Sequence, residues 1–316
     1  MNGSILLPFS GSRESMFAMD LAWTLAERLE MSVDAQHVVN IRGALDVLGV
    51  TTPGIIGSGP YVGAFESLCS ELRNIATKLE DSYKARKAGR GVSGEWFVDE
   101  GEPVDIIVNR STQHDLLVMG HHQHEQPEQQ LLRHQAVRLS LSEILSQTSH
   151  APLLVVQNQF TSISELALIL AVDHVNSKWI GNCMQLASAL QVNCSLTFLA
   201  AGLHEEPPTD FVRDLKDANP ALVDLKMRIV TREGHQPAAL ATHHLRGLLG
   251  EPGCLPVIAT IDNEERRITS FGESPSDMLR RLAFDALLIW PEESRYPLFP
   301  ESAGTNDANE PLQLTS

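Results

Sequence analysis

Long apolar runs are missing from this sequence, and so are the paired cysteines of secreted proteins. No stretch reaches the roughly 18 to 20 consecutive apolar residues that a membrane-spanning helix needs, so no membrane segment is expected. None of the four cysteines belongs to a C-x-x-C pair; they are Cys69, Cys183, Cys194 and Cys254. The first residues enter an apolar run with no basic segment before it, so we expect no signal peptide. These features predict a reduced, cytoplasmic setting.

Basic residues are scarce as well. The 316 residues include 24 Lys and Arg against 40 Asp and Glu, which gives a net charge of −16. Both halves share the deficit, with 12 basic and 19 acidic residues up to Asn158 and 12 and 21 beyond it. Binding to a phosphate backbone needs clustered Lys and Arg, and an acidic surface repels such a backbone. Nucleic acid and anionic membranes are therefore not expected as partners.

Familiar catalytic and metal-binding patterns are also lacking. The sequence contains neither a G-x-S-x-G nucleophile elbow nor a Walker lysine motif. A run of histidines does invite a metal interpretation: His121, His122 and His124, with His134 further on. Adjacent histidines in a strand-like loop point to opposite sides, however, and no cysteine lies near them. We therefore expect no specific metal site.

What the chain does contain is an alternation of short apolar runs and amphipathic segments. In its first half we expect strands at 4–9, 32–39, 94–98, 115–120 and 153–156, and helices at 12–30, 64–87, from 103, and at 139–148. Short, continuously apolar strands are typical of a parallel sheet covered on both faces. Ligands of such sheets bind beyond the carboxyl ends of the strands, so the loop after Gly120 is the expected site.

The second half repeats this order after a linker near residues 157–164. We expect strands at 166–172, 194–200, 223–230, 256–261 and 286–290, and helices at 177–190, 208–218, 238–246 and 276–282. The chain thus divides into two α/β domains, residues 1–158 and 164–291. The tail, residues 292–316, is rich in Pro, Ser, Asn and Glu, which predicts disorder.

Four stretches of the first half resemble a universal stress protein domain. They are Ser10-Gly11-Ser12 after the first strand, the turn Gly101-Glu102-Pro103, the run Asp115–Gly120 and the run His150–Val156. The whole chain is similar to a tandem member of that family, although the second half matches by order more than by identity. The resemblance implies an open, five-stranded, mostly parallel sheet in each domain, with helices on both faces, as in adenine nucleotide alpha hydrolase-like folds. It also implies pairing of two domains through their last strands, within this chain or in a homodimer.

The resemblance further implies a place for ATP. Many members bind it through G-x2-G-x9-G-(S/T) after the fourth strand, where glycines let backbone N–H groups approach the phosphates. Here Gly120 matches the first glycine and Ser140 the final residue, but Gln123 and Leu139 replace the other two glycines. The loop is also six residues longer than the motif, and Ser10 stands where the family has Asp. The motif is degenerate.

Two hypotheses for function remain open. In the first, the protein is a non-catalytic stress-response regulator that acts through contacts with other proteins or with itself. In the second, it is a switch whose cofactor is ATP or another adenine nucleotide, held at Ser10, Val39, Gly120 and Ser140, with or without slow hydrolysis. If Gly120 serves the phosphates, Gly120→Val should abolish ATP binding and leave the fold intact. An enzyme of the related nucleotide-processing families is a weaker third idea, because no acid–base pair recommends it.

The second half offers less for a nucleotide. Asp173 ends its first strand, and Ser274 matches the terminal Ser of the motif. Its fourth strand runs into Asp262-Asn-Glu-Glu-Arg-Arg267, where carboxylates would repel phosphate. We expect a solvated charged loop there, with an anion contact through Arg266 and Arg267 as the alternative.

Overall fold

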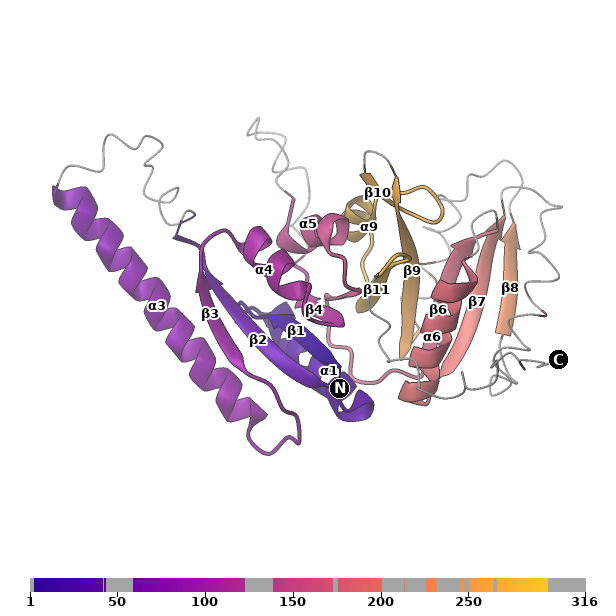
Figure 1. The fold of residues 1–316 in the computed structure, drawn as a ribbon, viewed down its shortest axis with the longest axis horizontal. Helices are drawn as coiled ribbons and strands as arrows, with labels where there is room; N and C mark the ends of the chain where they lie inside the picture. The colour runs from indigo at the N-terminus through magenta and orange to yellow at the C-terminus, as the bar shows by residue number, and fades with distance from the viewer. Residues whose placement is uncertain are drawn as a thin grey trace, which may run out of the picture.

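One continuous sheet runs through both halves of the molecule (Figure 1). The computed structural model describes residues 3–41, 43, 59–122, 139–172, 176–200, 213, 226–231, 245, 247, 251–263 and 266–294. The sheet has 11 strands in the order β3-β2-β1-β4-β5-β11-β9-β6-β7-β8, with β10 paired to β9. The strands of the first half are β1 (Ser4–Pro8), β2 (Ser32–Val39), β3 (Trp96–Glu100), β4 (Leu116–Gly120) and β5 (Leu153–Val156). Those of the second are β6 (Glu165–Ala171), β7 (Asn193–Ala200), β8 (Lys226–Thr231), β9 (Cys254–Asn263), β10 (Arg266–Thr269) and β11 (Ala286–Pro291).

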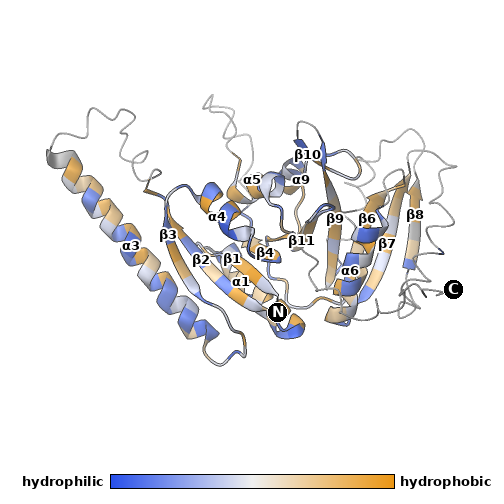
Figure 2. Ribbon diagram, in the orientation of Figure 1, coloured by the Kyte–Doolittle hydropathy of each residue, from blue (hydrophilic) through white to orange (hydrophobic). Residues whose placement is uncertain are grey.

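The fold class predicted from the sequence is confirmed. Within each half neighbouring strands run parallel, apart from the β9–β10 pair, and the strands follow one order: β3-β2-β1-β4-β5 and β8-β7-β6-β9-β11. The central strands are buried and hydrophobic along almost their whole length (Figure 2), because helices cover both of their faces.

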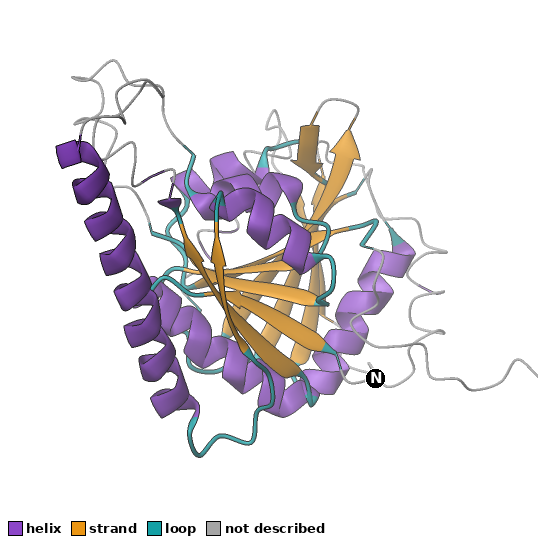
Figure 3. Ribbon diagram, turned by 60° about the vertical axis from the view of Figure 1, so that its left-hand side comes forward, coloured by secondary structure: helices purple, strands orange, loops and turns teal. Residues whose placement is uncertain are grey.

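Helices lie on either side of the sheet (Figure 3). One face is covered by α1 (Arg13–Leu29), α3 (Gly59–Lys87) and α6 (Ser177–Leu190). The other is covered by α4 (Pro103–Ser111), α5 (Leu141–Thr148) and α9 (Pro275–Arg281). Of these, α3 begins at Gly59 rather than at Ala64 as expected. The helices predicted at 208–218 and 238–246 lie outside the described residues except for Arg213 and Leu245, and so does the tail beyond Ser294.

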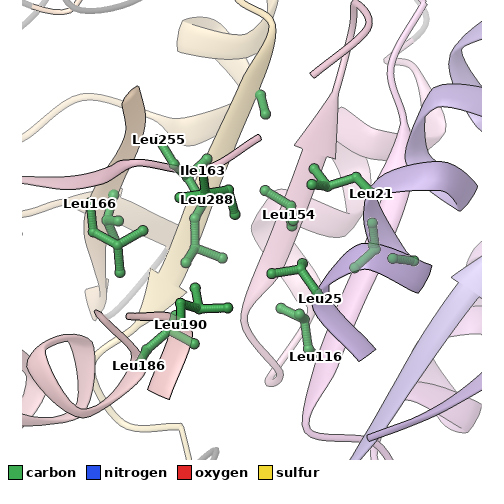
Figure 4. Packing of buried hydrophobic residues seen from close by; sticks show 14 of the residues in the cluster. Leu21, Leu25, Leu116, Leu154, Ile163, Leu166, Leu186, Leu190, Leu255 and Leu288 are labelled. Carbon is green, nitrogen blue, oxygen red and sulfur yellow. The ribbon is translucent and has the colours of Figure 1, made fainter. Parts of the chain in front are cut away.

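The two halves meet through their last strands. β5 and β11 pair antiparallel, with Leu153 opposite Ile289 and Val156 opposite Ala286. All four side chains are almost inaccessible to solvent. On the α1 and α6 face, buried leucines from both halves form one cluster across this junction (Figure 4). The hydrophobic core is therefore shared, so burial of apolar surface binds the halves together.

Candidate functional site

A cavity of about 570 Å³ lies where the sequence places the ligand site, at the carboxyl ends of β1, β2 and β4. Ser10, Gly120 and Ser140 line it together, although they are far apart in the chain. Val39, the fourth predicted residue, is buried and is not part of the wall; its neighbour Val38 is. The wall on β2 is formed by the three consecutive residues Gln36, His37 and Val38.

Gly120 is held closely against the first turn of α1. A Cβ added to Gly120 would lie 2.5 Å from the backbone N of Ser15 and 2.5 Å from the carbonyl C of Glu14. Such a distance is far inside van der Waals contact, so any side chain would force β4 and α1 apart. Gly120 is therefore needed for packing. The expectation that Gly120→Val leaves the fold intact disagrees with this geometry, because it assigned the glycine to the ligand alone.

The N-terminus of α1 lies beside this cavity, and its own N-cap residue Ser12 caps it. The Ser12 hydroxyl accepts a hydrogen bond from the Ser15 amide at 3.2 Å, as expected of an N-cap residue. Glu14 lies in the first turn, 3.4 Å from Nδ1 of His122. Its partial burial raises the pKa of the Glu14 carboxyl, but hydrogen bonds from its own backbone amide, His122 and Ser12 outweigh burial and leave the pKa lowered. The positive end of α1 thus already has a carboxylate.

The N-terminus of α5 is occupied in the same way. The Ser140 hydroxyl accepts from the Glu143 amide at 3.3 Å, and the Glu143 carboxylate accepts from the Ser140 amide at 2.5 Å. This reciprocal pair is a capping box. The second oxygen of Glu143, a side chain 2% exposed, accepts from Nε of Arg280 on α9 at 3.1 Å. The signal for this carboxylate, Ser-x-x-Glu at residues 140–143, was available in the sequence but was not used there.

Replacing Ser140 with alanine is expected to lower the free energy of unfolding by about 1 kcal/mol, because the Glu143 amide loses its cap. Chemical denaturation followed by circular dichroism measures the change. Ser82→Ala, at an exposed position in the C-terminal part of α3, is the matched control and should leave the midpoint unchanged or raise it slightly, because alanine has the higher helix propensity. Equal midpoints for Ser140→Ala and the control would contradict the capping role.

The two histidines of the run that the structure describes, His121 and His122, point to opposite sides, as predicted. His121 is 2% exposed; its Nδ1 lies 2.6 Å from the Ser142 hydroxyl and its ring stacks on Phe284 at 5.8 Å. The side chain of His122 is 72% exposed. His124 and His134 lie outside the described residues. Within the described ranges, no three His, Cys, Asp or Glu side chains are grouped as a metal ion would require.

The corresponding region of the second half is built differently. Asp173 lies outside the described residues. Ser274 is the N-cap residue of α9, and its hydroxyl accepts from Nε2 of Gln147 on α5 at 2.6 Å. Ser274 therefore joins the two halves.

No helix described in the chain has the length and apolar character to cross a membrane.

The expected charged loop of the second half is largely a hairpin. β9 continues to Asn263 and β10 returns antiparallel from Arg266. Arg267 is 5% exposed; its Nε donates to Oδ1 of Asp262 at 2.7 Å, and its Nη1 donates to the carbonyl oxygen of Ser149 at the end of α5. The expectation of a solvated loop was wrong for Arg267, which is buried against the first half. The sequence offers no signal for a contact across 118 positions.

Comparisons with known proteins agree with this architecture. Residues 1–157 match the sequence profile of the universal stress protein family. Through this half the chain belongs to that family. Among curated proteins, none matches the chain.

Solved structures extend the likeness beyond the universal stress protein half. A universal stress protein from Archaeoglobus fulgidus DSM 4304 is 13% identical, with a TM-score of 0.57, and covers 92% of this chain and 97% of its own. A protein from Pseudomonas aeruginosa UCBPP-PA14 assigned to the same family is 11% identical, with a TM-score of 0.53, over 91% of this chain and 92% of its own. At these identities the likeness shows the fold, which spans both halves.

Proposed function

We propose that this universal stress protein is a non-catalytic regulator of the stress response that acts through contacts with other proteins or with a second copy of itself. The observation that carries the proposal is that α5 is bonded to residues of the second half. Its first turn accommodates the buried Glu143 carboxylate, and Arg280, Ser274 and Arg267 of the second half are bonded along its length. Helix α5, whose N-terminus would bind the phosphates of a nucleotide, instead contacts the second half.

A second candidate function is an adenine-nucleotide switch. The cavity beside Ser10, Gly120 and Ser140 favours it, because a volume of about 570 Å³ is within the usual range of small-molecule sites. Its wall combines apolar residues with serine hydroxyls, which suits a ligand of mixed polarity.

Filling the cavity separates the two candidates. Val38 lines the cavity on β2, whereas Val98, 44% exposed on the edge strand β3, does not. If the protein binds Mg-ATP, a concentration 100 times the dissociation constant should add about 2.7 kcal/mol of stability. Val38→Trp should then lose the shift in melting temperature and the control Val98→Trp should keep it. A shift that survives in Val38→Trp would place the nucleotide elsewhere.

The regulatory proposal is tested in cells that lack the gene. Survival under the inducing stress should be restored by the wild type and equally by Val38→Trp, since protein contacts do not need the cavity. Failure of Val38→Trp to restore survival, with Val98→Trp active, would overturn the regulatory proposal in favour of the switch. Native mass spectrometry of the purified protein provides a second measurement, because it reports subunit number and any co-purified nucleotide together.

A further inference from the structure

Helix α3 has a hydrophobic stripe that the described part of the protein leaves largely uncovered. Its apolar side chains recur at spacings of three, four, three and four residues: Phe65, Leu68, Leu72, Ile75 and Leu79. This spacing is the a and d pattern of helices that pack lengthwise against another helix. Of the five, only Leu79 packs against the hydrophobic core of the described residues. Ile75 is 46% exposed, and the remaining three are partly exposed.

The side of α3 that faces the protein's own core is a different one. Cys69, Ala76 and Tyr83 recur at intervals of seven residues, and all three are buried. At about 100° per residue, Ile75 lies about 100° around the helix axis from Ala76, and Leu68 lies about 80° around it in the same direction. Single exposed hydrophobic residues are ordinary, but a continuous stripe directed away from the core indicates an interaction surface.

The position of α3 leaves this stripe within reach of another molecule. The helix lies at one end of the sheet, beside the edge strand β3 (Figure 1). The last strands, β5 and β11, already pair with each other inside the chain, so a second copy must use another surface. The exposed side of α3 provides one.

Two charged residues beside the stripe favour a second copy of the same helix as the partner. Glu71 and Lys78 are exposed, and among the described residues neither is part of an ion pair. They are seven residues apart, with Ile75 near the midpoint. If two α3 helices cross antiparallel at Ile75, Glu71 of each copy lies opposite Lys78 of the other. A parallel pair would instead place like charges together, and such flanking charges set the orientation of paired helices.

We propose that two copies of this chain associate through α3, antiparallel and centred near Ile75, with reciprocal ion pairs between Glu71 and Lys78. Such a contact is isologous, because the same surface serves both copies. The segment from Leu68 to Leu79 is about 18 Å long, so the contact is smaller than a standard interface of about 800 Å² per partner. The dimer is therefore reversible, with a micromolar dissociation constant. This inference rests on the proposed regulatory function and names its contact surface.

Sedimentation velocity on the full chain tests the association, at concentrations from about 1 to about 100 μM. The wild type should change from monomer to dimer across this range. Ile75→Asp places a charge in the contact and should stay monomeric throughout. Ile229→Asp is the matched control, because Ile229 is 45% exposed on β8, at the opposite end of the sheet, and should dimerise as the wild type does. A monomeric wild type would overturn the proposal, and so would wild-type dimerisation by Ile75→Asp.

Charge reversal tests the antiparallel arrangement. Glu71→Lys and Lys78→Glu each replace two attractions by two repulsions, so each should weaken dimerisation about tenfold at low ionic strength. The double variant Glu71→Lys/Lys78→Glu should restore the wild-type affinity, since opposite charges again face each other. Both side chains are exposed, so these variants should fold normally. Single variants that dimerise as tightly as the wild type would overturn the assignment, and so would a double variant as weak as the single ones.

Failure of this inference is distinguishable from failure of the regulatory function. A monomeric wild type would overturn the α3 contact alone, because contacts with other proteins would still restore survival in cells that lack the gene. A wild type that dimerises through α3 but does not restore survival would overturn the regulatory function alone.

Discussion

Replacing Gly120 with valine is expected to lower the free energy of unfolding by about 3 kcal/mol, at the upper end of overpacking effects. The added Cβ would lie 2.5 Å from backbone atoms of Glu14 and Ser15. Backbone cannot move aside as the end of a flexible side chain can, so β4 and the first turn of α1 must separate. Because α1 covers one face of the shared core, the separation weakens packing well beyond the cavity.

Urea denaturation measures this loss, and Gly181→Val on α6 is the control. A Cβ at Gly181 meets no atom within 4 Å, so valine is accommodated there. The Gly120→Val midpoint should fall clearly while that of Gly181→Val stays close to the wild type. Equal midpoints would show that β4 and α1 have more freedom than the geometry allows. Because Gly120→Val disturbs the packing of β4 against α1, a loss of ligand binding in this variant would not show that Gly120 contacts a phosphate.

Replacing Arg267 with alanine is expected to lower the free energy of unfolding by about 2 to 3 kcal/mol, because charge-assisted hydrogen bonds are lost. Its guanidinium is bonded to both carboxylate oxygens of Asp262 and to the Ser149 carbonyl at the end of α5. The carbonyl is then left without this donor at the contact between the halves. Arg266→Ala is the control, since that neighbouring side chain is exposed and should tolerate the change.

The effect of Arg267→Ala should depend on pH. The hydrogen bond from Arg267 lowers the pKa of Asp262 below its ordinary value. The stability due to this pair is therefore fully present above the ordinary pKa and is lost as the pH falls through the lower, folded-state pKa. The difference in midpoint between wild type and Arg267→Ala should be constant from pH 5 to 7, about the range above aspartate titration, and shrink below it. A difference that grows on acidification would contradict the pairing.

The fold could be predicted because its signals are local. Continuous apolar runs such as Leu153–Val156 identify buried parallel strands, and Ser12 and Pro103 mark helix starts where the structure has them. The place of the cavity followed from the rule that ligands gather at the carboxyl ends of parallel strands.

The details of the site depend on contacts between distant residues. The sequence gives no sign that Gly120 presses on α1 or that Arg267 reaches Ser149. The sequence predicts that β2 contributes to the site, but not that the cavity wall ends at Val38, one residue before Val39. Nothing in the sequence indicates that the side-chain nitrogen of Gln36 donates a hydrogen bond to Asp99 on the neighbouring strand β3.

The antiparallel pairing of β5 with β11 has a consequence for how the protein can change. When two identical subunits meet across such a seam, every mutation is introduced on both sides at once. Here the two halves are encoded separately within one gene, so a mutation in one half leaves the sequence of the other half unchanged. The first half has an open cavity, and the second has the β9–β10 hairpin, whose Arg267 contacts the first half. A single gene thus yields two joined halves that can diverge independently.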